Sequence, residues 1–245
     1  MVVPCYNEAQ RFAFEYWALL VKIPNSYWLF VDDGSTDETK KWLTQFIETN
    51  QAENASVLSN LENQGKGESV RGAIRHLVHF GLVDNHTVGF IDADGAVPAE
   101  EVMQFIDRSR KLLSNDPGPA IDAVWSSRVA LAGRKIRRQQ SRFYVGRIIH
   151  TVIGTRYPTI PYDTQCGLKL FKVSDALLGE LEEPFRTRWF FEIEMILRRR
   201  SNGDLFRIRE EPLEEWNEIG GSHISGKEIF RVFFEMLKLV SGRWI

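Results

Sequence analysis

Residues 88–98 read VGFIDADGAVP, an apolar run that ends in two aspartates separated by one alanine. The run has the length of a buried strand in a parallel sheet, and Gly95 then allows the chain to turn. Two carboxylates two residues apart, Asp92 and Asp94, can share a hard divalent cation whose other positions are filled by water or phosphate oxygens. By itself the stretch is better explained as an acidic turn in which an aspartate caps the next helix. The rest of the chain decides between these two interpretations.

The same alternation of strand, polar loop and helix occurs three times before this stretch. Apolar runs at 2–4, 28–31 and 57–58 each lead into a loop rich in Asp, Asn or Gly and then into an amphipathic segment. Asn7 is placed to cap the first helix, and a second helix is expected over 37–49. This order predicts an α/β fold of Rossmann-like type, a mostly parallel sheet with helices on both faces. Ligands bind beyond the carboxyl ends of such strands, so the four loops should meet at one rim.

Composition and charge limit the classes of function. The chain has 245 residues, 43% hydrophobic and 26% charged, so it can bury a sizeable core, and no linker-like segment divides it. The net charge of -2 gives no general case for a nucleic-acid partner. Cys5 and Cys166 lack metal-type spacing, and we expect reduced thiols in a cytoplasmic protein. The sequence has no apolar run of about 18 residues. It also has no GxGxxG after the first strand, which argues against a dinucleotide-dependent oxidoreductase.

Four motifs in the first half carry a resemblance to a known family. In chain order they are VPCYNE at 3–8, VDDGSTD at 31–37, NQGKG at 63–67 and DAD at 92–94. In sequence and spacing they resemble the family 2 glycosyltransferases, whose fold is GT-A. This likeness covers roughly residues 1–130. It implies one GT-A domain over 1–245, with a nucleotide-sugar-binding half at 1–130 and an acceptor-binding half at 131–245.

The second half is similar to a narrower branch, the dolichyl-phosphate (polyprenyl-phosphate) glucosyltransferases. The matching stretches are DTQCGLKLF at 163–171, RWFFEIE at 188–194 and EWNEIGGS at 215–222. Glu192 stands where this branch usually has Asp, and His223 stands where it usually has Lys. Its members usually carry an N-terminal membrane anchor, which we do not expect in this chain.

The resemblance implies an inverting enzyme whose donor is a UDP-sugar, most simply UDP-glucose, and which binds Mg²⁺ or Mn²⁺. It assigns the metal to Asp94, with Asp92 either sharing the metal or lying nearer the ribose, and makes Asp94 catalytic. It gives Asp33 a hydrogen bond from the uracil ring. Lys66, between two glycines, is expected to approach the nucleotide, with a solvated turn lysine as the alternative. The remaining nucleotide-binding residues are expected to be Pro4, Tyr6, Asn7, Glu8 and Gly34.

The acceptor decides which further groups the reaction needs. A lipid phosphate such as polyprenyl phosphate is largely a dianion at pH 7, so it needs cations rather than a general base. The segment 128–147 is rich in arginine, a residue that binds phosphate through a bidentate fork, although a solvated helix face is the alternative. From this segment and the later motifs we expect the acceptor to be bound by Arg128, Arg138, Arg142, Gln165, Trp189 and His223. Core packing is the alternative for Trp189, and a structural role in its turn is the alternative for His223.

A saccharide hydroxyl, in polysaccharide or glycoconjugate synthesis, is the alternative acceptor. A hydroxyl is a poor nucleophile and requires a general base, for which Glu192 is the candidate. By resemblance Asp163 lies on the acceptor side, and it joins Asp94 and Glu192 as an expected catalytic residue. A non-catalytic nucleotide-sugar-binding protein is a third possibility, against which the intact DAD argues.

Two amphipathic segments bear on where the protein works. The stretch 143–153 and the final helix at 229–240 present apolar side chains fringed by Lys and Arg. Such segments can lie on a bilayer surface and bring the protein to a lipid substrate at the cytoplasmic face of a membrane. Core helices or an oligomer interface are the alternatives.

Overall fold

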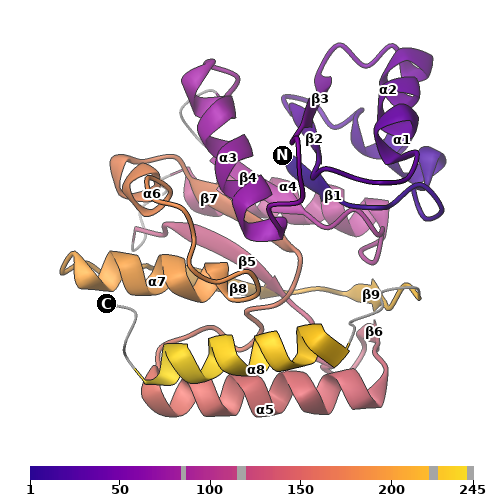
Figure 1. Ribbon diagram of the computed structural model, residues 1–245. Helices are drawn as coiled ribbons and strands as arrows, with labels where there is room; N and C mark the ends of the chain where they lie inside the picture. The colour runs from indigo at the N-terminus through magenta and orange to yellow at the C-terminus, as the bar shows by residue number, and fades with distance from the viewer. Residues whose placement is uncertain (84–86, 115–119, 221–225, 242–245) are drawn as a thin grey trace.

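The computed structural model describes residues 1–83, 87–114, 120–220 and 226–241. These residues form a seven-stranded sheet in the order β3-β2-β1-β4-β7-β5-β8 (Figure 1). Its strands are β1 (Val2–Cys5), β2 (Trp28–Asp32), β3 (Ala55–Ser59), β4 (Thr87–Ile91), β5 (Ala123–Ser127), β7 (Leu168–Lys172) and β8 (Ile208–Pro212). Strand β7 runs antiparallel to both of its neighbours, and the other neighbouring pairs of this sheet are parallel. The prediction of a mostly parallel sheet is confirmed.

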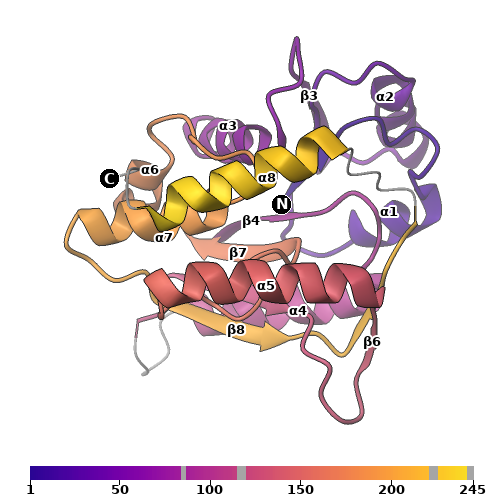
Figure 2. The ribbon, with the colours of Figure 1, turned by 60° about the horizontal axis from the view of Figure 1, so that its bottom comes forward.

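Helices cover both faces of the sheet, as predicted (Figures 1 and 2). Alternate residues of a strand enter different hydrophobic clusters, since successive side chains point to opposite faces. Val3 and Phe30 pack in one cluster, and Val2 and Leu29 in the other. The first cluster contains residues of α1 (Phe14–Leu20), α2 (Thr39–Asn50) and α4 (Ala99–Leu113). The second contains residues of α3 (Lys66–His79), α5 (Gln140–Arg156), α6 (Asp175–Glu180), α7 (Phe191–Ser201) and α8 (Gly226–Val240).

A second, two-stranded sheet lies beside the loop that follows β4. Its strands β6 (Lys135–Arg137) and β9 (Glu215–Asn217) pair in parallel. The amide of Asn217 donates to the carbonyl of Ala96 at 2.8 Å, which joins this sheet to the loop after β4. Segments from the second half of the chain are thereby brought next to the DAD motif.

The loop after β1 differs from the prediction. Helix α1 begins at Phe14 and not near Asn7. Asn7 has a φ of 53°, and its side-chain oxygen accepts hydrogen bonds from the amide and hydroxyl of Thr36 at 2.9 and 3.3 Å. The amide of Asn7 also donates to the hydroxyl of Ser35 at 3.0 Å. The predicted cap was wrong because Asn7 bonds to the loop after β2 rather than to a helix of its own.

Helices α5 and α8 lie side by side on the second face (Figure 1). The Tyr157 hydroxyl, just after α5, donates to the carbonyl of Leu239 at 3.0 Å, so the carboxyl ends of the two helices are adjacent. Met236 and Leu239 of α8 are buried, whereas Phe230 and Phe234 are exposed. Among the described residues, no helix combines the length and apolar character that crossing a bilayer requires.

Both cysteines are free and buried, as the sequence predicts for reduced thiols. Burial raises the pKa of each thiol above its ordinary value. The hydroxyl of Ser126 lies 2.9 Å from the sulfur of Cys166. Cys166 is therefore a packed neighbour of the sheet rather than an activated nucleophile.

Candidate active site

A cleft of about 510 Å³ lies beyond the carboxyl ends of β1, β2 and β4. This volume is that of an ordinary small-ligand site. Asp33 and Asp94, from separate loops, both line it, as the predicted topology requires. The lining side chains that matter below are Pro4, Tyr6, Glu8, Arg11, Asp33, Lys66, Asp92, Asp94, Arg128, Arg138, Gln165, Arg188, Trp189, Glu192 and Trp216.

A larger cavity, of about 880 Å³, opens at the opposite end of the sheet. Its described lining residues include Tyr27, Leu77 and Arg110 but no aspartate or glutamate. A divalent metal prefers carboxylate oxygens. The chemistry expected from the sequence therefore belongs to the smaller cleft.

The two carboxylates of the DAD motif are held in different ways. Asp92 forms an ion pair with Lys66, in which Oδ1 of Asp92 lies 2.6 Å from Nζ of Lys66. Asp94 accepts a hydrogen bond from the amide of Ala96 at 3.0 Å. A Cβ at Gly167 would overlap the carboxylate of Asp92, so any larger residue there would have to displace this carboxylate. Burial, followed by the charge of Asp92, raises the pKa of Asp94 above its ordinary value.

The donor set of this corner fits magnesium or manganese. These ions take one or two protein carboxylates and complete their shell with phosphate oxygens and water. Asp92 and Asp94 supply the carboxylates, and no group of three or more metal-ligating side chains occurs among the described residues. Glu8 lies in the same cleft, and its Oε2 atom is buried without a hydrogen-bond partner. Burial raises the pKa of Glu8, the Arg11 ion pair opposes this, and the charges of Asp94 and Asp92 add to the rise.

Lys66 begins α3 and points to the acidic corner. Burial alone would lower the pKa of this lysine, but the charges of Asp92, Glu192 and Asp94 outweigh it, so the pKa lies above its ordinary value. Lys66 therefore stays an ammonium ion in the cleft. The alternative of a solvated turn lysine does not describe this position.

Asp33 organises the loop that precedes α3. Its Oδ1 atom accepts hydrogen bonds from Asn60 Nδ2 and the Gln64 amide, both at 2.9 Å, and its Oδ2 atom accepts one from the Gly65 amide at 2.8 Å. The carboxylate is 3% exposed, so it fixes the NQGKG turn against the end of β2.

The loops after β1 and β2 bond to each other, and only some of their residues face the cleft. Pro4, Tyr6 and Glu8 line the cleft, and the Glu8 amide donates to the Thr39 hydroxyl at 2.7 Å. Asn7 and Gly34 are not lining residues; Asn7 bonds across to the second loop, as described above. Gly34 has a φ of 65°, and a Cβ there would lie 2.5 Å from the backbone of Glu62. Both residues shape the rim without facing the space inside it.

Arg128 is fixed on the acceptor side by Asp163. The guanidinium Nε and Nη2 atoms each lie 2.7 Å from an oxygen of Asp163, and the Arg128 amide donates to the same carboxylate at 3.0 Å. Burial by itself would raise the pKa of Asp163, but the charge and hydrogen bonds of Arg128 lower it to about 2. The same pair raises the pKa of Arg128 against the effect of burial. Asp163 itself is not a lining residue of the cleft.

The other expected acceptor residues are placed unequally. Arg138 lines the cleft, and its Cζ atom lies 5.4 Å from the ring centroid of Phe143. Burial and then the charge of Arg128 lower the pKa of Arg138. Gln165 and Trp189 line the cleft together, since Gln165 Nε2 donates to the Trp189 carbonyl at 3.3 Å. The side chain of Arg142 and the whole of His223 lie outside the described residues.

Glu192 reaches the floor of the cleft as half of a buried ion pair. Its Oε1 atom lies 2.8 Å from Lys169 Nζ, which also donates to the Thr164 carbonyl at 2.6 Å. Its Oε2 atom is buried and has no hydrogen-bond partner. Burial lowers the pKa of Lys169, although the charge of Glu192 opposes this.

Sequence reasoning did not assign Lys169 or Arg188. Lys169 stands in the apolar strand sequence LKLFK, where a fully buried lysine signals a nearby carboxylate. Arg188 opens the RWFFEIE motif, and no distinctive spacing indicates a function for an arginine next to a tryptophan in a loop.

Three similar proteins of known name are dolichyl-phosphate beta-glucosyltransferases. A dolichyl-phosphate beta-glucosyltransferase of Trichomonas vaginalis, ALG5A, is 27% identical over 248 residues, which is 98% of this chain and 72% of the relative. The Saccharomyces cerevisiae dolichyl-phosphate beta-glucosyltransferase is 27% identical over 92% of this chain and 68% of its own length. The human one is 26% identical over 100% of this chain and 76% of its own length.

Solved structures share the fold. The mannosyltransferase PcManGT from Pyrobaculum calidifontis, in complex with GDP-Man and Mn²⁺, superposes with a TM-score of 0.60 at 18% identity, over 99% of this chain and 62% of the other. Residues 1–349 of S. aureus TarS in complex with UDP give a TM-score of 0.53 at 17% identity, over 98% of this chain and 63% of the other. The chain thus spans about three fifths of each solved chain, and its fold is GT-A. The sequence model described as glycosyl transferase family 2 matches residues 1–155, more than half of the chain, and the protein therefore belongs to glycosyl transferase family 2.

Proposed function

We propose that the protein transfers glucose from UDP-glucose to a polyprenyl phosphate, with inversion at the anomeric carbon and with the help of Mg²⁺ or Mn²⁺. The observation that carries this proposal is that one cleft holds an acid pair, the Asp33-anchored turn and the two arginines Arg128 and Arg138. The relatives named above are glucosyltransferases whose names specify dolichyl phosphate, a polyprenyl-type acceptor.

The donor is proposed to bind along the loops of the first half. The uracil ring lies by Asp33 and the Pro4–Glu8 loop, and the diphosphate lies by Lys66 and the acid pair. Asp92 and Asp94 would hold the Mg²⁺ or Mn²⁺ ion, which when bound would neutralise the leaving diphosphate as a Lewis acid. Two proteins that share this fold are known in complex with UDP and with GDP-Man and Mn²⁺, which supports a nucleotide and a metal as ligands here.

The acceptor is proposed to enter from the second half. A phosphate dianion is already a competent nucleophile, so this chain has only to hold it in line with the bond that breaks. Arg128 and Arg138 supply the cations, and Asp163 holds Arg128 in place through both of its oxygens. We therefore assign Asp163 to positioning rather than to proton transfer. The phosphate oxygen forms a bond to the anomeric carbon as the bond to the UDP diphosphate breaks, and the linkage changes from α to β.

Transfer to a saccharide hydroxyl is the second candidate, because the unpartnered Oε2 of Glu192 is available as a general base. Glu192→Gln distinguishes the two acceptors. A lipid-phosphate enzyme should keep substantial turnover, whereas a hydroxyl-acceptor enzyme should lose about 100-fold or more. Thermal unfolding of the variant must accompany the assay, because the change also leaves Lys169 buried without its anion.

Helices α5 and α8 are proposed to rest on the cytoplasmic face of a membrane. Their exposed apolar side chains are Tyr144, Ile148, Phe230, Phe233, Phe234 and Leu237. Arg156, Arg231 and Lys238 are exposed on the same two helices and suit anionic lipid headgroups. The pairing of α5 with α8 leaves these apolar side chains uncovered, which supports a bilayer contact over a role as core helices.

A thermal-shift screen tests the donor and the metal together. UDP-, GDP- and dTDP-glucose and their free nucleotides are compared with and without MnCl₂, and stabilisation is expected for the UDP series with manganese. Stabilisation by another nucleotide base would replace the proposed donor. Slow metal-dependent hydrolysis of UDP-glucose would exclude a protein that only binds nucleotide-sugars.

Asp94→Ala provides the matching site variant. We expect it to lose manganese-dependent stabilisation by UDP while it unfolds at a temperature within a few degrees of the parent, because Asp94 is half-buried at the rim. Retention of the manganese effect in this variant would contradict the assignment of the metal to the DAD motif.

A further inference from the structure

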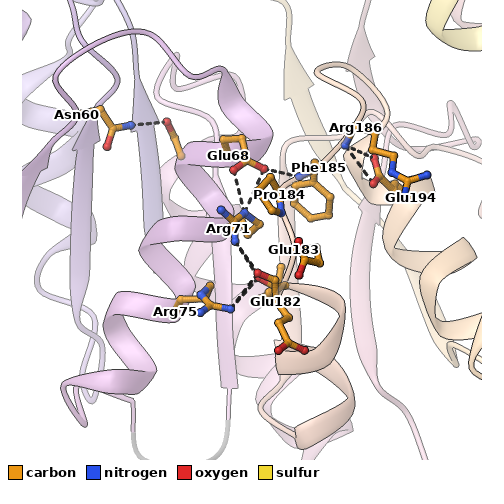
Figure 3. A network of polar contacts seen from close by, with 12 residues as sticks. Asn60, Glu68, Arg71, Arg75, Glu182, Glu183, Pro184, Phe185, Arg186 and Glu194 are labelled. Atoms are coloured by element: carbon orange, nitrogen blue, oxygen red, sulfur yellow. Dashed lines mark hydrogen bonds and ion pairs between the residues drawn. The ribbon is translucent and has the colours of Figure 1, made fainter. Parts of the chain in front are cut away.

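A segment of nine residues, 181–189, crosses between α3, α7 and α8 on its way to the cleft. Side chains of α3 hold its first part through the backbone (Figure 3). Glu68 accepts a hydrogen bond from the Phe185 amide at 2.6 Å, and Arg71 donates to the Leu181 carbonyl at 3.0 Å. Because these bonds go to the backbone of the 181–189 segment, they fix its path irrespective of its own side chains.

The end of the 181–189 segment is fixed from two other helices. Glu194 of α7 accepts hydrogen bonds from the amide and hydroxyl of Thr187 at 3.0 and 3.2 Å. Glu235 of α8 accepts from the amides of Arg188 and Trp189 at 3.2 and 3.1 Å through the same oxygen, Oε2. Two consecutive amides aimed at one carboxylate oxygen set the direction in which the Arg188 side chain leaves the backbone.

The Arg188 side chain lies flat across Gly65. A Cβ at Gly65 would be 2.9 Å from both Cγ and Nε of Arg188 and 3.2 Å from Cζ. Gly65 stands between Asp33, which accepts its amide hydrogen, and Lys66, which begins α3. The guanidinium is therefore next to the stretch that joins the proposed base site to the proposed diphosphate site.

The charge of Arg188 is uncommitted. In the cleft, Arg11 pairs with Glu8, Lys66 pairs with Asp92 and Arg128 pairs with Asp163. Within the part of the chain that the structure describes, Arg188 is half-buried and its side chain has neither an ion pair nor a hydrogen bond. A partly desolvated cation that faces a cleft without a counter-ion suits an anionic ligand.

We propose that Arg188 is a further donor-binding residue, which binds a phosphate of the nucleoside diphosphate, and that Glu235 is the residue that positions it. The inference rests on the proposed nucleotide-sugar donor and adds a cation that the family motifs did not assign. It also connects the cleft to α8, because the carboxylate that directs Arg188 belongs to that helix.

Isothermal titration of the full chain with uridine and with UDP, each in the presence of MnCl₂, tests the role of Arg188. Arg188→Gln should lower the affinity for UDP about tenfold or more and leave the affinity for uridine unchanged, because only UDP carries the phosphates. Arg200→Gln, the same change at an exposed arginine of α7, is the control for net charge and should bind both ligands as the parent does.

A short-chain polyprenyl phosphate in detergent separates the two sources of phosphate. If Arg188→Gln weakened binding of the lipid phosphate and not of UDP, the donor assignment would be overturned. Equal UDP affinity in parent and variant would overturn the role of Arg188 while leaving the proposed function intact. A parent protein that binds no UDP would instead remove the proposed function, and this inference with it.

Glu235 is tested by the same titrations. Glu235→Ala should lower the affinity for UDP, as Arg188→Gln does. The affinity for uridine and the unfolding temperature should stay as in the parent, because only a general structural defect would change them as well. Glu235→Gln, which keeps one oxygen acceptor, should recover part of the loss. Glu235→Ala in the Arg188→Gln background should add little, and a full additive loss would contradict action through Arg188.

Discussion

Gly167 is the residue whose backbone lies directly against the carboxylate of Asp92. A Cβ there would lie 2.0 Å from Oδ2 of Asp92, so a side chain fits only if the Asp92 carboxylate moves. Gly167→Ala should displace Asp92 and lower the affinity for Mn²⁺ in the presence of UDP by about 10- to 100-fold, the usual effect of disturbing a metal ligand's support. Titration calorimetry measures this loss directly.

Gly72→Ala is the matched control. Gly72 lies within α3, and a Cβ there meets nothing within 4 Å. The substitution should raise the free energy of unfolding by up to about 1 kcal/mol and leave metal binding as it was, since alanine favours helix. If Gly167→Ala also bound Mn²⁺ like the parent, Asp92 would be free to move and the proposed crowding would be wrong.

Arg128, directly after β5, is joined to the loop before β7 by its ion pair with Asp163. Asp163 has a pKa of about 2 in the folded protein against an ordinary 3.8. The unfolded chain therefore binds the proton at higher pH than the folded chain. The stabilisation is complete above about pH 4 and is lost as the pH falls towards 2, with a total of about 2 kcal/mol.

Asp163→Asn removes this titration. Urea unfolding between about pH 5 and 2 should show a shallower loss of stability in the variant than in the parent. At neutral pH the variant should be less stable by about 3–5 kcal/mol, because Arg128 is left buried without its anion. Asp107→Asn breaks an exposed pair with Lys111 and should cost less than about 1 kcal/mol. Parallel pH curves for parent and Asp163→Asn would refute the assignment.

The first four strands were predictable because each combines an apolar run with a polar loop of distinctive sequence, as at 28–37. The direction of β7 was not, because LKLFK is the same short apolar pattern in a parallel or an antiparallel strand. Ion pairs between residues distant in the sequence could not be predicted either. Arg128 and Asp163 are 35 positions apart, and nothing in the sequence around one of them indicates the other. Asn7 shows the same limit, since its partner in the second loop replaced the expected local cap.

At the scale of the whole molecule, the pair α5 and α8 presents a group of exposed apolar side chains. Phe233→Ser with Phe234→Ser should reduce co-sedimentation with phosphatidylcholine vesicles that contain phosphatidylserine, because both side chains are exposed on α8. Binding of UDP with Mn²⁺ should be unchanged in the same protein.

Leu205→Ser removes an exposed leucine outside both helices and should sediment with vesicles as the parent does. Sedimentation of the double phenylalanine variant at the parental level would exclude α8 as the membrane contact. A change in its oligomeric state instead, seen by analytical ultracentrifugation, would favour an interface between copies.

The ion pair between Lys66 and Asp92 has a consequence for the order in which ligands arrive. Because Lys66 already neutralises one carboxylate of the acid pair, Mn²⁺ has to compete at Asp92 with an ammonium group that cannot diffuse away. A nucleoside diphosphate would offer that ammonium another anion and would thereby free Asp92 for the metal. We expect metal and nucleotide to bind with strong positive cooperativity, with little metal bound alone, and equilibrium dialysis with and without UDP would show it.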